Sequence, residues 1–172
     1  FFHFFLPTRV DPSRRNSQFF NIKNDEVVRF LAEELIPWVY KNHNVSTAPS
    51  KNVIAGASFG GLMSSYFALR HPEFFGNVIS QSGSYWWSPD TDTNYLAHEV
   101  EGEWLTRQYA ESPANATRFV IEIGLNEGGA PNMPIVNRHF RDILKAKGYD
   151  VVLYDEFNGG HDTLNWRGSL GE

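Results

Sequence analysis

The sequence predicts an α/β fold in which helices cover both faces of a mainly parallel sheet. Strand-like and helix-like segments alternate along the chain, an arrangement typical of parallel strands joined by helical crossovers. The 172 residues are enough for one domain with a sizeable core. A glycine-rich turn also joins one apolar strand directly to an apolar helix. We therefore expect residues 1–172 to belong to a single domain.

Five segments are expected to be strands because they are short, apolar and bounded by turn residues. The first ends at Pro7, whose ring excludes it from the interior of a sheet, and a polar loop follows over residues 7–24. The other four are separated by helices or by an irregular section. The expected strands are residues 1–6, 52–56, 77–81, 118–124 and 150–157.

Helices are expected between these strands, with Pro37 expected to kink or shorten the first of them. A terminal helix begins near Trp166 and Arg167, which we interpret as structural residues. The section 84–115 holds aromatic, acidic and turn residues, and we interpret it as an excursion that forms a lid or a substrate pocket. The expected helices between the strands are residues 25–40, 59–70 and 133–147.

The composition is that of an ordinary globular protein, with 41% hydrophobic and 20% charged residues. A net charge of −5 argues against a nucleic-acid partner or an anionic-membrane anchor. There are no cysteines, which excludes disulfides and thiol catalysis and fits a reducing cytoplasm. The apolar start of the chain is too short to span a membrane and lacks the basic leader of a signal peptide.

The motif Gly56-Ala57-Ser58-Phe59-Gly60 indicates a nucleophilic serine. Its G-x-S-x-G pattern lies between an apolar strand and an apolar helix, as in the nucleophile elbow of α/β-hydrolases. Glycines are needed there because the chain must turn sharply around a strained serine. The N–H of Phe59 is a candidate oxyanion donor. The alternatives are a structural serine or a phosphate-binding turn, although the known phosphate-binding patterns are missing.

His161 is the candidate general base. It follows the last expected strand in the segment NGGHD, as expected for the chain order serine, acid, histidine. Gly159 and Gly160 allow a tight loop that brings the imidazole over Ser58. No histidine pattern suggests a metal site, so neither a metal nor a cofactor is expected. The other histidines are interpreted as surface or packing residues: His3, His43, His71, His98 and His139.

Glu127 is the candidate acid because it is the only carboxylate in the loop after the fourth expected strand. It would hold the tautomer of His161 and stabilise the imidazolium. The alternative is a solvated loop glutamate. Asp162 is adjacent to the histidine in sequence, a spacing that rarely gives the needed geometry. Asp155 and Glu156 on the last strand remain further candidates.

Three stretches together resemble the enterochelin (enterobactin) esterase family of siderophore hydrolases. They read AGASFGGLMSSYFALRHPEFFGNVISQSGSYWW, EIGLNEG and EFNGGHDTLNWRGSL. The resemblance implies an α/β-hydrolase that cleaves ester bonds between catechol-acylated serines and releases iron from a ferric siderophore in the cytoplasm. It supports Ser58, His161 and Glu127 as the catalytic residues. The wider esterase-D group also includes feruloyl and acetyl esterases, which leaves the substrate open.

Three residues are candidate substrate contacts. The family carries an arginine beside the site where this chain has Arg15, which could pair with anionic catecholates or instead with Asp11. Trp86 and Trp87 follow the carboxyl end of a strand, the edge where open α/β sheets bind ligands. They could stack on aromatic rings of a substrate, or pack the excursion in place.

The hydrolase layout also predicts missing N-terminal strands. Counted back from the elbow, residues 52–56 correspond to strand 5 and residues 1–6 to strand 4. Strand 3, which lies between them in this fold, and the loop that supplies the second oxyanion donor have no counterpart. We therefore expect the natural protein to carry more N-terminal sequence, and the 172-residue chain alone to fold poorly and hydrolyse esters weakly.

The sequence thus predicts a serine esterase that acts on a catecholate siderophore through an acyl-enzyme. A feruloyl or acetyl carbohydrate esterase would use the same residues on a different substrate. A hydrolase-fold protein that binds a siderophore or a partner without turnover is the alternative from another functional class.

Overall fold

The computed structural model describes residues 26–89, 102–129 and 132–169. The chain divides into two compact units, residues 1–47 and residues 48–172. The first predicted strand therefore lies outside the described residues.

The described part of the first unit is a helical segment. It consists of α2 (Glu26–Arg29), a π-helical stretch (Phe30–Leu35) and α3 (Ile36–Asn42). The helix was predicted over 25–40 with a disturbance at Pro37. The structure places that disturbance before the proline. In a regular α-helix the proline ring would clash with a carbonyl of the preceding turn, and here that turn belongs to the π-helical stretch. The helix then continues two residues beyond the predicted end.

The second unit is built on four parallel strands in the order β1-β2-β3-β4. Three of them begin and end as the sequence predicts, and β1 lies one residue later than predicted. Within the described residues β1 pairs with β2 alone. A strand on the other side of β1, which the hydrolase layout implies, stays a prediction. The strands are β1 (Val53–Ala57), β2 (Asn77–Gln81), β3 (Arg118–Gly124) and β4 (Asp150–Phe157).

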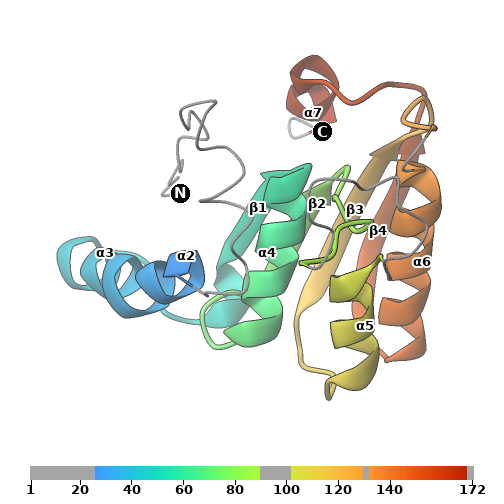
Figure 1. Cartoon of the computed structure of the whole chain (residues 1–172). Coiled ribbons are helices and arrows are strands. Elements are labelled where there is room, and N and C mark those ends of the chain that lie inside the picture. Colours follow the sequence, from blue (N-terminus) through green and yellow to red (C-terminus); the bar gives the residue numbers. More distant parts are fainter. Residues whose placement is uncertain (1–25, 90–101, 130–131, 170–172) are drawn as a thin grey trace. The chain divides into compact units, whose positions relative to one another are not determined.

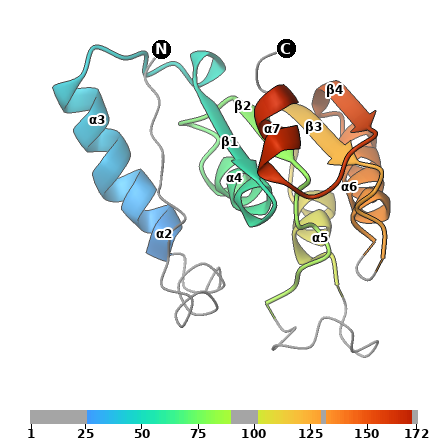
Figure 2. The same ribbon diagram turned by 90° about the horizontal axis from the view of Figure 1, so that it is seen from above.

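Helices α4, α5 and α6 lie on one face of this sheet (Figures 1 and 2). Each connects two neighbouring strands, and right-handed crossovers between strands in sequential order place every connecting helix on the same side. The helical layer predicted for the other face is not formed by the described residues of this unit. The helices are α4 (Phe59–Arg70), α5 (Trp104–Glu111) and α6 (Met133–Ala146), and a short 3₁₀ turn covers Pro49–Lys51.

An aromatic cluster between the helices and the sheet forms the core. Tyr85 stacks on Phe140 with ring centroids 3.9 Å apart, and Tyr109 meets the same ring edge-on at 5.1 Å. Phe119 on β3 packs perpendicular to Tyr109. All four side chains are fully buried. This packing ties helices α5 and α6 to the strand that precedes the predicted acid.

Helix α5 was not predicted, because residues 84–115 were expected to form an irregular excursion. Leu105 and Tyr109 on this helix are fully buried, so part of the section belongs to the core. The role of the section as a lid or a substrate pocket stays a prediction. Residues 90–101 lie outside the described part of the chain.

A last helix, α7 (Thr163–Ser169), follows β4 and lies beyond the carboxyl ends of the strands (Figure 1). It begins three residues before Trp166, earlier than predicted. Parallel strands present their carboxyl ends at one edge of a sheet, where α/β proteins place their ligand sites. None of the helices in the described ranges is long and apolar enough to cross a membrane.

Candidate active site

Ser58 occupies a sharp turn between β1 and α4. Its backbone has φ 57° and ψ −122°, a conformation that costs free energy for any residue with a Cβ. A Cβ on Gly56 would lie 2.3 Å from the backbone of Gly60, so the strand and the helix approach too closely for a side chain there. The N–H of Ser58 donates to the carbonyl of Gln81 at 2.8 Å, which fixes the turn against β2. The predicted nucleophile elbow therefore has the local geometry that the motif implies.

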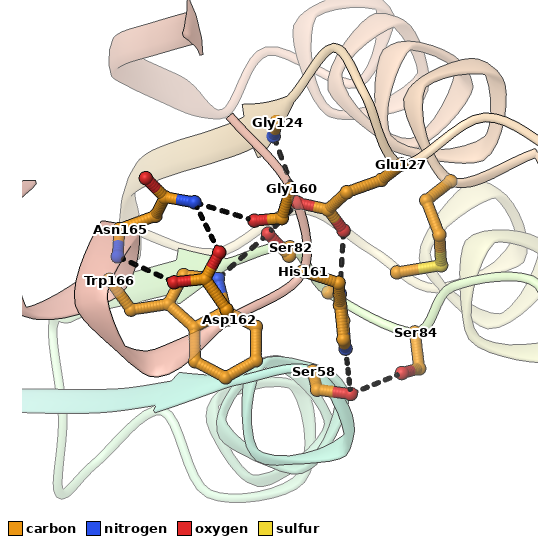
Figure 3. Close-up of polar contacts among 12 residues, drawn as sticks. Ser58, Ser82, Ser84, Gly124, Glu127, Gly160, His161, Asp162, Asn165 and Trp166 are labelled. Atoms are coloured by element: carbon orange, nitrogen blue, oxygen red, sulfur yellow. Dashed lines mark hydrogen bonds and ion pairs between the residues drawn. The ribbon is translucent and has the colours of Figure 1, made fainter. Parts of the chain in front are cut away.

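His161 lies in the loop between β4 and α7, and its Nε2 is 2.9 Å from the Oγ of Ser58 (Figure 3). Gly159, two residues before His161, is tightly enclosed, since a Cβ there would lie 2.6 Å from the ring of Phe157. The ring of Trp166 meets the imidazole edge-on, with the centroids 4.8 Å apart. The loop and the terminal helix together hold the imidazole over the serine.

Glu127 lies in the loop after β3 and points at the other nitrogen of the imidazole. Its Oε2 is 2.6 Å from Nδ1 of His161, and its side chain is 1% exposed. The second oxygen, Oε1, accepts hydrogen bonds from the hydroxyl of Ser82 at 2.6 Å and from the N–H of Gly124 at 3.0 Å. A buried carboxylate needs such donors to offset its lost hydration.

The other candidate acids point elsewhere. Asp162 accepts hydrogen bonds from two backbone N–H groups at the start of α7, which is the role of a helix cap. Glu156 forms a bidentate ion pair with Arg138, which lowers the pKa of that carboxyl. Asp155 is exposed on β4. Glu127 is thus the one predicted acid that contacts the imidazole.

Phe59 is the first residue of α4, directly after Ser58. Its N–H therefore lies at the amino end of that helix, where backbone N–H groups and the helix dipole favour negative charge.

Sequence reasoning missed Ser84, whose Oγ lies 3.3 Å from the Oγ of Ser58 and whose N–H donates to the carbonyl of Ser58 at 3.1 Å. It also missed Ser82. Both lie in the segment SQSGSYWW, and only their contacts in the folded chain distinguish them from other buried serines.

The two tryptophans have different surroundings. Trp86 is half-buried and packs edge-on against Phe59, with centroids 5.6 Å apart, so its ring lies next to the residue that follows the serine. Trp87 is 4% exposed and packs perpendicular to Trp104, which favours the packing interpretation for this residue. The third candidate contact, Arg15, lies outside the described residues.

The arrangement matches the requirements of nucleophilic catalysis by a hydroxyl. The nucleophile is within hydrogen-bond reach of a base, and a third group orients that base. The three residues come from the carboxyl ends of β1, β3 and β4 and are separated by up to 103 positions in the chain. In the described ranges no three histidine, cysteine, aspartate or glutamate side chains come together in a way that could hold a metal ion.

Comparison with protein families finds a match over residues 11–172 to the model described as "Putative esterase". Among curated proteins, the chain is 37% identical over 144 residues to the iron(III) enterobactin esterase of Escherichia coli strain K12. That alignment covers 81% of this chain and 33% of the relative. The chain therefore spans about a third of the length of the curated relative that it matches.

A solved structure of the enterobactin esterase from Shigella flexneri, in the presence of 2,3-dihydroxy-N-benzoyl-serine, matches with a TM-score of 0.74 and 31% identity. The match covers 94% of this chain and 39% of that one. An endo-1,4-beta-xylanase/feruloyl esterase of Xylanibacter ruminicola is 25% identical over 85% of this chain and 17% of that protein. The resemblance to enterochelin esterases and the α/β-hydrolase fold, both predicted from the sequence, are confirmed.

Proposed function

The chain belongs to the esterase family whose model spans its residues 11–172, and we propose that it is the catalytic part of a serine esterase with Ser58, His161 and Glu127 as its catalytic residues. The observation that carries this proposal is the continuous contact from Glu127 through His161 to Ser58, at 2.6 Å and 2.9 Å. We further propose that residues 1–172 belong to a single hydrolase domain.

In the proposed reaction, the Oγ of Ser58 attacks the carbonyl carbon of the ester while Nε2 of His161 accepts the hydroxyl proton. The N–H of Phe59 stabilises the negative charge that develops on the carbonyl oxygen. The imidazolium returns the proton to the leaving alkoxide, which departs as an alcohol and leaves an acyl group on the serine. Water, activated by the same imidazole, then releases the acid.

Glu127 serves this cycle by stabilising the charge on the imidazole. Its Oε2 accepts the Nδ1 proton of His161, which leaves Nε2 with the lone pair that faces Ser58. The carboxylate is buried, so the imidazolium formed after proton transfer lies beside an anion in a medium of low dielectric constant. This stabilisation is greatest in the states where the histidine is charged.

The proposed substrate is an ester of a catecholate siderophore, whose hydrolysis would release its iron in the cytoplasm. The enterobactin esterases among its relatives support this choice. So does the position of Trp86 beside Phe59, because an aromatic ring next to the serine suits a catechol ring. A feruloyl ester is the second candidate substrate, supported by the relative that carries a feruloyl esterase activity in its name.

The proposal is tested on the purified natural protein, with any sequence that it carries beyond these residues. It is offered three substrates: a simple aryl ester, ferric enterobactin and a feruloyl carbohydrate ester. We expect hydrolysis of the aryl ester and of the siderophore, and covalent labelling by a fluorophosphonate that Ser58→Ala abolishes. Preference for the feruloyl ester would assign the second candidate. Binding of ferric enterobactin without any labelling or turnover would contradict catalysis and identify a binding protein.

A further inference from the structure

The two oxygens of the Glu127 carboxylate have different partners. Oε2 faces Nδ1 of His161, while Oε1 accepts from the Ser82 hydroxyl at 2.6 Å and from the N–H of Gly124 at 3.0 Å (Figure 3). A carboxylate on a flexible side chain can rotate and present either oxygen to the histidine. Donors fixed on Oε1 restrict that rotation, so the geometry at Oε2 depends on them.

Ser82 is held in a conformation that side chains disfavour. Its φ is 49°, and only Ser58 and Glu103 share a positive φ among the other described non-glycine residues. Its side chain is fully buried at the end of β2, and its N–H donates to the carbonyl of Glu122 at 2.7 Å. A glycine would adopt this backbone at lower cost. The side chain must therefore form an interaction that offsets the strain. The hydrogen bond from its hydroxyl to Glu127 is that interaction.

Trp166 fixes the direction in which the Ser82 hydroxyl donates. The indole Nε1 of Trp166 is a donor only and lies 3.0 Å from the Oγ of Ser82, so this oxygen accepts the indole proton. The hydroxyl proton of Ser82 is then directed at Oε1 of Glu127. The same indole ring packs edge-on against His161, and the carbonyl of Trp166 accepts from the side chain of Gln81 at 2.8 Å.

We propose that Ser82 and Trp166 are positioning residues that orient the Glu127 carboxylate toward His161, an inference that rests on the proposed esterase function. The indole donates to Ser82, Ser82 donates to Glu127, and Glu127 accepts from His161. The terminal helix thereby contributes to the geometry of the acid as well as to the packing of the base. Ser82, which the sequence did not single out, thereby gains a role. Trp166, which was interpreted as structural, gains a second one.

Three variants test this assignment. Ser82→Ala removes the hydroxyl and keeps the Cβ, while Ser82→Gly removes the hydroxyl and also relieves the positive φ. Trp166→Phe removes the indole N–H and keeps an aromatic ring beside His161. Ser65→Ala is the matched control, because Ser65 is also fully buried and bonds to the hydroxyl of Tyr85 away from the catalytic residues.

We expect Ser82→Ala and Ser82→Gly to lower kcat for an aryl ester roughly ten- to a hundredfold, which is the effect of losing a hydrogen bond to a charged group. Trp166→Phe removes a hydrogen bond to the neutral Ser82 hydroxyl, so we expect a smaller loss of roughly two- to tenfold. KM is expected to stay unchanged, since the hydrogen bonds that are removed orient Glu127 and do not involve Ser58. The concentration of active sites is counted by fluorophosphonate labelling, so that unfolded protein does not lower the apparent kcat. The double variant Ser82→Ala/Trp166→Phe is expected to lose less than the product of the single losses.

A second measurement does not depend on turnover. The proton in the 2.6 Å contact between Glu127 and Nδ1 of His161 is expected to give a far-downfield NMR signal. We expect this signal to broaden or move upfield in all three variants and to stay in place in Ser65→Ala. A signal unchanged in Ser82→Gly would overturn the inference even if the chain proved not to be an esterase. Wild-type turnover together with variant kcat values equal to the control would overturn it while leaving the proposed esterase intact.

Discussion

Replacing Gly56 with alanine should separate the packing of the elbow from its sequence motif. The new Cβ would lie 2.3 Å and 2.4 Å from the backbone carbonyl of Gly60. That is about 1 Å closer than an ordinary van der Waals contact, and the neighbour is backbone that no rotamer change can move away. Strand β1 and helix α4 must therefore move apart on either side of the serine.

The expected cost follows from this overlap. Overpacking by one methyl group destabilises a core by about 1–3 kcal/mol, and the rigid neighbour places Gly56→Ala near 3 kcal/mol. For a chain of this length that corresponds to a fall in Tm of roughly 6–12 °C. A shift of Ser58 on the order of 1 Å relative to His161 would also lower kcat about a hundredfold.

Gly60→Ala is the matched control, because it changes the other glycine of the motif. A Cβ there meets no atom within 4 Å. Gly60 lies in the first turn of α4, where alanine raises helix propensity, so we expect a gain of at most about 1 kcal/mol. Denaturant unfolding gives both values, and fluorophosphonate labelling reports on Ser58. Equal stability of the two variants would refute the claim that β1 and α4 approach too closely for a side chain at Gly56.

Three further predictions concern charged and buried groups. Glu127→Gln should lower kcat by on the order of 10²–10⁴-fold with little change in KM, and a wild-type rate would move the role of the acid elsewhere. Burial raises the pKa of Tyr85 from 10.0 to about 12, so its contribution to stability is complete below pH 10 and lost toward pH 12; the stability difference between wild type and Tyr85→Phe should shrink over that window. The hydrogen bonds from Arg138 lower the pKa of Glu156 below its usual 4.5, so the loss of stability in Glu156→Gln should be complete above pH 4.5 and should disappear as the pH falls through the lowered pKa.

The sequence alone predicted much of the sheet and which elements carry the proposed catalytic residues. The apolar segments that became β2, β3 and β4 are bounded by turn residues, and this local chemistry sets the ends of a strand without reference to the rest of the fold. The G-x-S-x-G motif around Ser58 is equally local, since the strained turn needs small neighbours. The loop after β3 holds a single carboxylate, so the position of the acid followed from the order of the elements.

The sequence failed where tertiary contacts decide the structure. Helix α5 was missed because its part of the sequence is rich in turn residues and because it is stabilised chiefly by burial of Leu105 and Tyr109 against the core. Neighbouring tryptophans also differ, since Trp86 packs beside Phe59 whereas Trp87 is buried against Trp104. Local patterns cannot distinguish two adjacent identical residues whose surroundings are set by distant parts of the chain.

The hydrogen bonds around Glu127 are the strongest example of this division. Sequence order determined that a serine, a glutamate and a histidine follow three strands of one sheet. Only the folded chain brings Trp166 to Ser82, which lies 84 positions earlier, and Ser82 to Glu127, which lies 45 positions later. Hydrogen bonds form over about 3 Å and depend on direction, so they are fixed by the register of the strands and the docking of the last helix. The residue types are encoded locally, and their partners are decided by tertiary packing.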